Sequence, residues 1–273
     1  MTKNNLLVYT YANKKYYPFA ILYPIFLLQK NPNTQVEITI ENFNEFSSQY
    51  QHLLDFYKKH YPNVFYHQIN ENIKALPGTI RFISTPEKTA KYVYIGDIDI
   101  FICENILKPH LKNIKENNLD YSNIKRKNEY VLSGLHFIKY DKMYPVKIPS
   151  DVNLETERDE SVLYKMMLTK GYKIPDENKH TFRPLLGLHA SYYSRPPLPT
   201  LTTKDCIVKN FPSWFTNTDP KSKDKGKKYA KQYLKLRYSK PIKKFMQHIK
   251  YSDIELRKII QNIDIVCWYY KKN

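Results

Sequence analysis

The sequence predicts an α/β protein in which a mainly parallel sheet carries helices on its faces. Strand-like and helix-like segments alternate through the first 70 residues, and a later buried strand ends at two aspartates. Such alternation is typical of parallel strands joined by helical crossovers. The chain has 273 residues, 42% of them hydrophobic, and only six glycines, so it can bury a sizeable core as a globular protein.

The N-terminal region supplies the first elements of this sheet. Residues 36–40 alternate apolar and polar side chains as a strand does, and residues 42–60 repeat apolar side chains at helical spacing. The Asn31-Pro-Asn33 turn ends the long apolar segment before them. The expected elements are strands at 6–9, 36–40 and 64–67 and helices at 16–29 and 42–60.

The middle of the chain adds a second group of elements. A helix is predicted over 78–90, although Pro86 would kink its interior. The apolar run 92–95 predicts a buried strand that ends at Gly96. Further expectations are a strand at 131–140, a helix at 155–170 and a stiff, extended connector at 195–199.

The strongest chemical signal is the Asp97-Ile98-Asp99 sequence directly after that buried strand. The carboxyl ends of strands in an open α/β sheet form the edge at which ligands bind. Two carboxylates there suit a hard divalent cation that keeps open positions for substrate phosphates. The motif alone is weak evidence, because two aspartates that cap a turn fit the same pattern.

Four segments extend the pattern. They are Leu7-Val-Tyr-Thr-Tyr-Ala-Asn13, Thr79-Ile-Arg81 ahead of the aspartates, Leu132-Ser-Gly-Leu-His-Phe-Ile138, and His189-Ala-Ser-Tyr-Tyr-Ser-Arg195-Pro196. In this order and spacing they resemble the GT-A glycosyltransferases, specifically the family-eight-like group with lipopolysaccharide galactosyl- and glucosyltransferases and glycogenin. The resemblance spans roughly residues 6 to 196 and implies a Rossmann-like GT-A fold.

The resemblance implies a metal site and a diphosphate site. His189 would be the third protein ligand beside Asp97 and Asp99, and an imidazole suits Mn²⁺ better than Mg²⁺. His180 is a rival for that role. Arg195 stands where the group has a lysine, and its guanidinium would bind the departing diphosphate.

A nucleotide-sugar site is implied around the same strand. Tyr11 and Leu132 depart from the group's pattern, as do Ala12 and Tyr192, which leaves the identity of the donor open; a stack of Tyr11 on a uracil face is one possibility. Gly134 would allow close approach of the donor sugar. The implied donor-binding residues are Thr10, Tyr11, Asn13, Arg81, Asp97, Ile98, Ser133, Gly134 and Arg195.

Two acidic residues begin the helix predicted at 155–170. Asp159 and Glu160 resemble the group's Asp-Gln pair near the anomeric carbon, which implies a catalytic role alongside Arg195. The group's reaction retains the anomeric configuration. Because Glu160 replaces an amide, it could instead be a nucleophile or, in an inverting enzyme, a general base. Both acids could also simply stabilise the helix dipole.

The formal net charge of +18 is concentrated near the C-terminus. Residues 221–273 hold 16 Lys and Arg against 4 Asp and Glu, a net +12 of that +18. Aromatic residues are interleaved with these cations, as at Trp268 and Tyr238. The pattern indicates either docking on an anionic membrane surface or a solvated charged face packed on the catalytic domain.

These observations give a domain division and a location. Residues 1–200 are expected to form the catalytic domain, with the nucleotide sugar in 1–102 and the acceptor side in 103–200, and 201–273 a basic, aromatic-rich helical extension. The three separated cysteines indicate a reducing compartment. We expect a cytoplasmic enzyme at the inner face of the membrane, acting on a glycan or lipid-linked oligosaccharide.

The function expected from the sequence is hexose transfer from a UDP-sugar, with Mn²⁺ or Mg²⁺, in bacterial lipopolysaccharide, O-antigen or capsule synthesis. One alternative is a haloacid-dehalogenase-type phosphatase, whose nucleophile also follows a strand. That class expects Thr or Val where this chain has Phe101. Another is a basic nucleic-acid-binding protein, but the charge is confined to one region and no recognition motif is visible.

Overall fold

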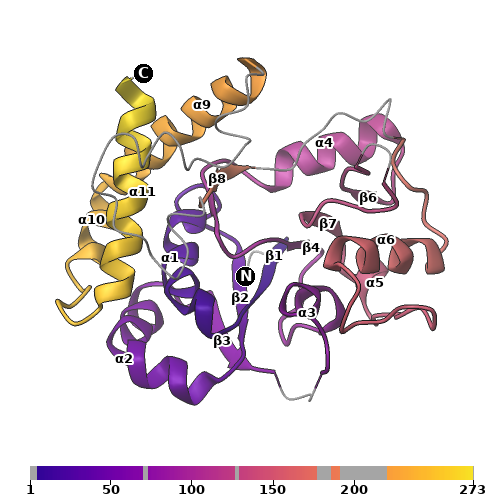
Figure 1. The fold of residues 1–273 in the computed structure, drawn as a ribbon, viewed down its shortest axis with the longest axis horizontal. Coiled ribbons are helices and arrows are strands. Elements are labelled where there is room, and N and C mark those ends of the chain that lie inside the picture. The colour runs from indigo at the N-terminus through magenta and orange to yellow at the C-terminus, as the bar shows by residue number, and fades with distance from the viewer. Residues whose placement is uncertain (1–4, 70–72, 127–128, 177–185, 191–219, 273) are drawn as a thin grey trace.

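The computed structural model describes residues 5–69, 73–126, 129–176, 186–190 and 220–272. Within these ranges, six strands form a mixed sheet in the order β3-β2-β1-β4-β7-β6 (Figure 1). The neighbours among β1 to β4 are parallel, whereas β7 is antiparallel to β4 and to β6. The strands are β1 (Leu6–Ala12), β2 (Gln35–Ile40), β3 (Val64–Gln68), β4 (Tyr92–Ile95), β6 (Tyr121–Ser122) and β7 (His136–Lys139).

This sheet confirms the predicted α/β class with a mainly parallel sheet flanked by helices. The alternation of the first 70 residues is observed as β1, α1 (Tyr17–Leu28), β2, α2 (Phe43–His60) and β3, with the short 3-10 helix η1 (Lys14–Tyr16) before α1. Every residue of α1 is buried, which explains its continuous apolar sequence. The Asn42 side chain accepts a hydrogen bond from the Glu45 N–H at 3.1 Å and begins α2.

The helix predicted over 78–90 is shorter than expected. The observed helix, α3 (Pro77–Ile83), ends before Ser84, whose backbone is extended. Beyond it the buried Glu37 carboxylate on β2 accepts hydrogen bonds from the backbone N–H groups of Glu87 and Lys88 at 2.7 and 2.8 Å. Those N–H groups are therefore satisfied outside a helix, and Pro86 never lies within one.

Two further boundaries differ from the prediction. Only β7 of the predicted strand 131–140 lies in the sheet, because the Asn123 side chain binds both backbone polar groups of Ser133. Helix α6 (Asp159–Thr169) begins four residues later than 155. The Asn153 side chain accepts a hydrogen bond from the Glu155 N–H at 3.0 Å, which forms a turn there.

Side chains alternate between two apolar layers on the faces of the sheet. On one face Val8, Tyr94 and Phe137 join α1 and α2 in the larger cluster. On the other face Leu7 and Val93 join residues of α3 and α6, with the short α5 (Tyr140–Met143) beside them. Helix α4 (Leu107–Asn117) packs beside β6. Figure 1 shows α1 and α2 separated from α3 and α6 by the sheet.

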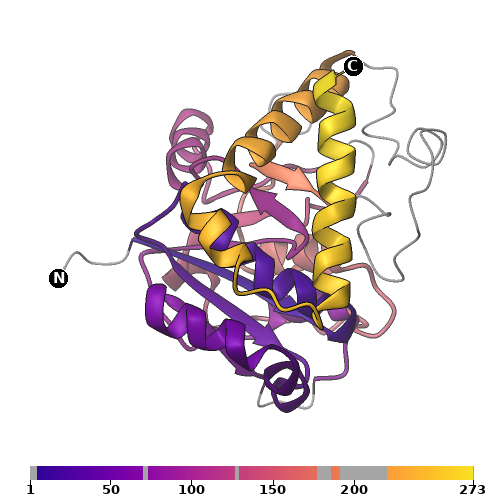
Figure 2. The same ribbon diagram turned by 90° about the vertical axis from the view of Figure 1, so that its left-hand side faces the viewer.

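The C-terminal extension is helical, as predicted, and its described part packs on the sheet domain. It comprises α9 (Pro220–Arg237), α10 (Lys240–Met246) and α11 (Ile254–Lys272), which lie together on one side (Figure 2). The Tyr233 ring stacks on Phe26 of α1 with centroids 5.1 Å apart. The carboxylate of Glu104, just after residues 100–102 of the sheet domain, also accepts a hydrogen bond from the Lys228 ammonium of α9 at 2.5 Å. Cation-rich helices therefore cover α1 with their apolar faces and leave charged side chains outside.

The boundary predicted at residue 200 lies outside the described residues, so the division into two domains stays a prediction. Among the helices that the structure describes, none has both the length and the apolar character that a membrane span requires.

A second, smaller sheet pairs β5 (Ile100–Ile102) antiparallel with β8 (Gly187–His189). We predict that Gly187→Ala destabilises the protein by about 3 kcal/mol. An added Cβ would lie 1.9 Å from the carbonyl oxygen of Phe101, so the two strands would have to separate. Chemical denaturation followed by circular dichroism measures the free energy of unfolding.

Gly171→Ala is the control for this prediction. Gly171 has a positive φ of 73° but open space around its Cα, so alanine there should cost only about 1 kcal/mol. An equal loss in both variants would contradict the close approach of β8 to Phe101.

Candidate functional site

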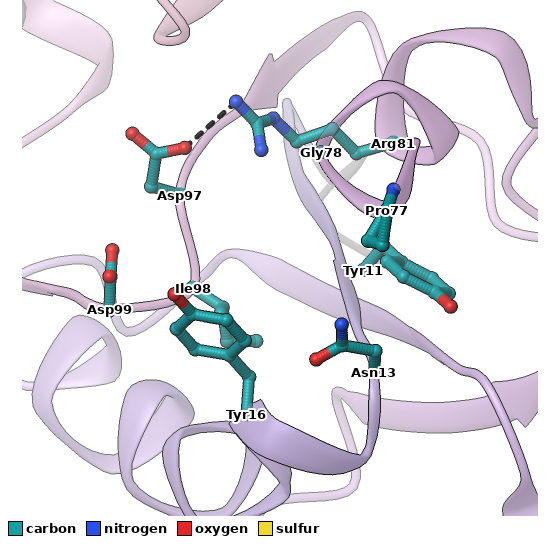
Figure 3. A pocket seen from close by; sticks show the side chains of 9 residues that line it. All are labelled: Tyr11, Asn13, Tyr16, Pro77, Gly78, Arg81, Asp97, Ile98 and Asp99. Atoms are coloured by element: carbon teal, nitrogen blue, oxygen red, sulfur yellow. Dashed lines mark ion pairs between the residues drawn. The ribbon is translucent and has the colours of Figure 1, made fainter. Parts of the chain in front are cut away.

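A pocket of about 180 Å³ opens where β1 and β4 end at the carboxyl edge of the sheet (Figure 3). This edge is where open α/β sheets place ligands. Residues from the ends of both strands, from η1 and from α3 form its walls, and they are Tyr11, Asn13, Tyr16, Pro77, Gly78, Arg81, Asp97, Ile98 and Asp99. Five of the donor-binding residues predicted from the sequence are in this set.

Asp97 lies at the centre of a charged cluster. Its Oδ1 is 2.8 Å from Nη2 of Arg81, which is also 2.8 Å from Oδ2 of Asp159. Burial raises the pKa of the Asp97 carboxyl, while the Arg81 guanidinium opposes that rise. Arg81 is only 8% exposed, and its Nε has no hydrogen-bond partner among the described residues. The pocket thus holds a cation with a donor still available beside two carboxylates.

The turn that carries Asp97 is fixed from below by Thr10. The Thr10 hydroxyl donates a hydrogen bond to the Gly96 carbonyl at 2.8 Å, and the side chain is fully buried. Thr10 is not among the residues that line the pocket, so its observed contact is with the turn. Ile98 does line the pocket, between the two aspartates.

The structure brings His189 to Asp99, and its role as a metal ligand stays a prediction. In the small sheet Ile100 pairs with His189, and the Ala190 N–H donates to the Asp99 carbonyl at 2.7 Å. This pairing places Nε2 of His189 3.3 Å from Oδ1 of Asp99. A residue 90 positions later in the sequence therefore reaches the Asp97-Ile98-Asp99 turn through backbone pairing.

Two carboxylates and an imidazole fit a divalent cation in their chemistry, since Mn²⁺ accepts both oxygen and nitrogen ligands. Within the described ranges no three acidic, histidine or cysteine side chains are already gathered as a metal site. Asp97 instead pairs with Arg81, and Asp99 with His189. Asp97 and Asp99 both line the pocket, so they can present oxygen atoms to a cation there.

The opposite end of the pocket has a different character. Oδ1 of Asn13 is buried and has no hydrogen-bond partner among the described residues, although it lines the pocket. A buried acceptor without a partner costs free energy, which a ligand N–H would recover. Tyr11 and Tyr16 add aromatic surface on either side of Asn13 (Figure 3).

Sequence reasoning missed Tyr16, Pro77 and Gly78 as pocket residues. Tyr16 was predicted to begin a helix over 16–29. The sequence did not show that it belongs to η1, the short helix that follows β1. Pro77 and Gly78 begin α3, which follows a segment with no strand signal. Their only sequence sign was the start of the helix that bears Arg81.

Gly134 lies against the charged cluster. A Cβ there would be 2.8 Å from Nη2 of Arg81 and 3.5 Å from the Asp97 carboxylate oxygens. The adjoining Ser133 accepts a hydrogen bond at its carbonyl from the Asn123 side chain at 2.9 Å and donates its N–H to it at 3.0 Å. Asn123 therefore fixes the backbone that presents Gly134 to Asp97. Neither Ser133 nor Gly134 is among the lining residues.

The two acidic residues of α6 have different surroundings. Asp159 bonds to Arg81 within the site, whereas the Glu160 carboxylate is held by Arg126 and, at 3.0 Å, by Arg158. Burial raises the pKa of the Glu160 carboxyl, and the Arg126 guanidinium opposes the rise. Both arginines were missed in the sequence, which gave no signal that they would converge on one carboxylate.

Arg195, His180 and the connector 195–199 lie outside the described residues. The predicted contact of Arg195 with a diphosphate stays a prediction.

Comparison with known proteins gives structural similarity only. No family model matches this sequence, and no curated protein matches it. Among solved structures, an active-site mutant of LgtC has a TM-score of 0.39 and 11% identity over 60% of this chain. S. aureus TarS 1–349 with UDP-GlcNAc has a TM-score of 0.42 and 12% identity, covering 98% of this chain and 92% of that one.

A third similar structure is the mannosyltransferase PcManGT from Pyrobaculum calidifontis with GDP-Man and Mn²⁺. Its TM-score is 0.43 at 12% identity, covering 99% of this chain and 86% of that one. This chain spans 64% of the LgtC chain and 55% of a longer TarS chain. Because all these TM-scores are below 0.5, the functional argument rests on the residues of the site.

We predict that Glu160→Gln gains stability relative to the wild type as pH rises from 4 to 7. The folded-state pKa of Glu160 is raised, so the stability it contributes is full below the unfolded pKa of about 4.3 and is lost as pH rises. Glutamine has no such loss. Urea denaturation at both pH values gives the two free energies of unfolding.

Glu157→Gln is the matched control, with the opposite sign. The Asn153 backbone N–H and the Lys165 ammonium lower the pKa of Glu157, so its contribution is present at pH 7 and lost in acid. This variant should lose stability relative to the wild type as pH rises. The same sign in both variants would refute the different environments of the two carboxylates.

Proposed function

We propose that the protein is a metal-dependent glycosyltransferase that moves a hexose from a UDP-sugar to a glycan acceptor. The observation that carries this proposal is that Asp97 and Asp99 line one pocket on the carboxyl edge of the sheet, with Nε2 of His189 3.3 Å from the Asp99 carboxylate. The proposal includes membership of the GT-A family-eight-like group and retention of the anomeric configuration. The anomeric form of the product tests the latter.

Asp97 and Asp99, with His189 beside them, would hold Mn²⁺ or Mg²⁺. A bound cation would neutralise the charge that grows on the nucleoside diphosphate as the glycosidic bond breaks. Arg81 supplies a positive charge of the chain itself in the same pocket, and its buried Nε–H, which has no partner among the described residues, would donate to a phosphate oxygen. Arg195 is the proposed second cation for the diphosphate.

The nucleoside end of the donor would occupy the side of the pocket formed by Tyr11, Asn13 and Tyr16. The unpaired Oδ1 of Asn13 would accept a hydrogen bond from a base N–H such as that of uracil, and the Tyr11 ring offers a face for stacking. These contacts support a nucleotide, and the choice of UDP is part of the proposal.

The sugar would lie toward Gly134 and Asp159. Gly134 lies directly against the Arg81–Asp97 pair, since an added Cβ would be 2.8 Å from Nη2 of Arg81, and Asp159 is bonded to the same guanidinium. Asp159 is therefore the carboxylate that would contact the reacting sugar. Glu160 is held by two arginines, so we assign it to the acceptor side of the site.

We also propose that the enzyme works at the inner face of a bacterial membrane, in lipopolysaccharide, O-antigen or capsule synthesis. Helix α10 and the turn after it expose Lys240, Lys243, Lys244 and Lys250. Beside them the apolar side chain of Ile254 is 56% exposed. Cations around exposed apolar side chains suit an anionic membrane surface, where lipid-linked acceptors are found.

Donor binding is tested by a thermal-shift panel of nucleotide sugars with and without Mn²⁺. A ligand at 100 times its Kd stabilises the native state by about 2.7 kcal/mol. For a chain of this size we expect Tm to rise by about 5 to 10 °C with a UDP-sugar, only when Mn²⁺ is present. Asp97→Ala should abolish the shift.

Asp120→Ala is the control, because Asp120 pairs with Lys142 and does not line the pocket. It should keep the full metal-dependent shift. A shift that survives in Asp97→Ala, or that does not require the cation, would contradict the proposed donor site.

Membrane docking is tested by sedimentation with phosphatidylglycerol vesicles. Each lysine near an anionic surface contributes about 1 kcal/mol, so the double variant Lys243→Glu/Lys244→Glu should bind at least about 30-fold more weakly. Binding of the wild type should also weaken with added salt. Vesicles of phosphatidylcholine alone should bind neither protein.

The control variant is Lys108→Glu/Lys115→Glu, which makes the same change in net charge on exposed lysines of α4. Figure 1 shows α4 and α10 on opposite sides of the molecule. If both double variants lost binding equally, net charge rather than the α10 surface would explain the result.

A further inference from the structure

We propose that Tyr130, with Arg126 and Arg158, forms the site that binds a pyranose ring of the acceptor. The inference rests on the proposed function and extends it to the acceptor side, where it names the residues that recognise the second substrate. Both arginines bind Glu160, the residue after Asp159 of the charged cluster, and none of the three side chains lines the donor pocket.

Backbone contacts place Tyr130 close to the reacting centre. Tyr130 is four residues before Gly134, so their Cα atoms are at most about 14 Å apart. A bridge between Lys125 and Leu132 and a hydrogen bond from the Leu132 N–H to the Glu160 carbonyl at 3.2 Å attach this segment to the first turn of α6. The Tyr130 backbone is therefore joined to the segment that carries Gly134 and to the first turn of α6.

The Tyr130 ring is an aromatic surface presented to solvent. The residue is 79% exposed, whereas most tyrosines of the described core are buried. Tyr164 of α6 packs edge-on against it with centroids 6.0 Å apart, and the Lys125 ammonium is 5.7 Å from its centroid. These two contacts hold the Tyr130 ring in position. The apolar C–H face of a pyranose can cover the exposed part and remove it from water.

The two arginines supply polar groups of the kind that sugar hydroxyls require. The side chains of Arg126 and Arg158 are 48% and 59% exposed, and both hold the Glu160 carboxylate. Each guanidinium has five N–H donors, and the ion pairs use only some of them. Glu160 therefore fixes two planar donors at the surface.

This arrangement explains the different partners of Asp159 and Glu160. Asp159 bonds inward to Arg81, which bonds to Asp97 in the donor pocket. Glu160, the next residue, bonds outward to Arg126 and Arg158. The first turn of α6 thus connects the donor pocket, through Asp159 and Arg81, to the proposed acceptor surface.

The test compares Tyr130→Ala with Tyr251→Ala. Tyr251 is the matched control, since it is 85% exposed and has the Arg257 guanidinium 4.7 Å from its ring centroid, but it lies between α10 and α11. The probes are a panel of nitrophenyl hexopyranosides and disaccharides, whose binding is measured by saturation-transfer NMR. Donor affinity is measured separately by thermal shift.

We expect the wild-type protein to bind members of the panel and Tyr130→Ala to bind them about tenfold more weakly. Transfer assays with the same glycosides should show a matching rise in the acceptor KM with little change in kcat. Tyr130→Phe should retain binding, because a ring face suffices. Neither the donor shift nor the Tm of the free protein should change in Tyr130→Ala, and Tyr251→Ala should resemble the wild type.

Equal glycoside binding by Tyr130→Ala and the wild type would overturn the acceptor site, as would wild-type protein that binds none of the panel. An equal loss in Tyr251→Ala would do the same. In each case an intact metal-dependent donor shift would leave the proposed function standing. Absence of any donor shift in the wild type would instead overturn the proposed function, and this inference with it.

Discussion

The interaction on which the site depends is the bond of one arginine to two carboxylates. Arg81 comes from α3, Asp97 from the turn after β4, and Asp159 from the first turn of α6. A buried guanidinium without partners would be very costly, and so would two buried carboxylates without a cation. Three elements that are separate in the sequence are therefore held in one arrangement by charge, which the apolar layers alone would not specify.

Around this contact the fold supplies rigid support from every side. Thr10 holds the turn before Asp97 through the Gly96 carbonyl, Asn123 holds the backbone next to Gly134, and the β5–β8 pairing brings His189 to Asp99. Each support is a hydrogen bond or a strand pairing that is made inside the protein. Contacts within the protein therefore fix the positions of the functional side chains.

Local pattern was enough to predict the parallel part of the sheet, because β1 and β4 are apolar runs and β2 alternates apolar and polar residues. It was also enough to predict that Asp97 and Asp99 lie at the end of a strand, where they line the observed pocket; their binding of a metal stays a prediction. The predicted C-terminal end of α3 and the predicted N-terminal end of β7 were wrong, because Glu37 and Asn123 bind backbone groups from distant segments. The pairs of Glu160 with Arg126 and Arg158 were missed for the same reason: no local pattern encodes which charges will meet. His189 was predicted only from the resemblance to a known family, and no local pattern indicated it.

The burial of α1 has a consequence for how the protein can be shortened. All twelve of its residues are buried, partly under α10 and α11. Deletion of the C-terminal helices would expose the apolar surface of α1 to solvent, and exposed apolar surfaces promote aggregation. The cationic C-terminal helices thus cover the apolar surface of α1 as well as carrying the charge of the surface. A variant with less positive charge therefore requires substitutions on the outer face of these helices instead of truncation.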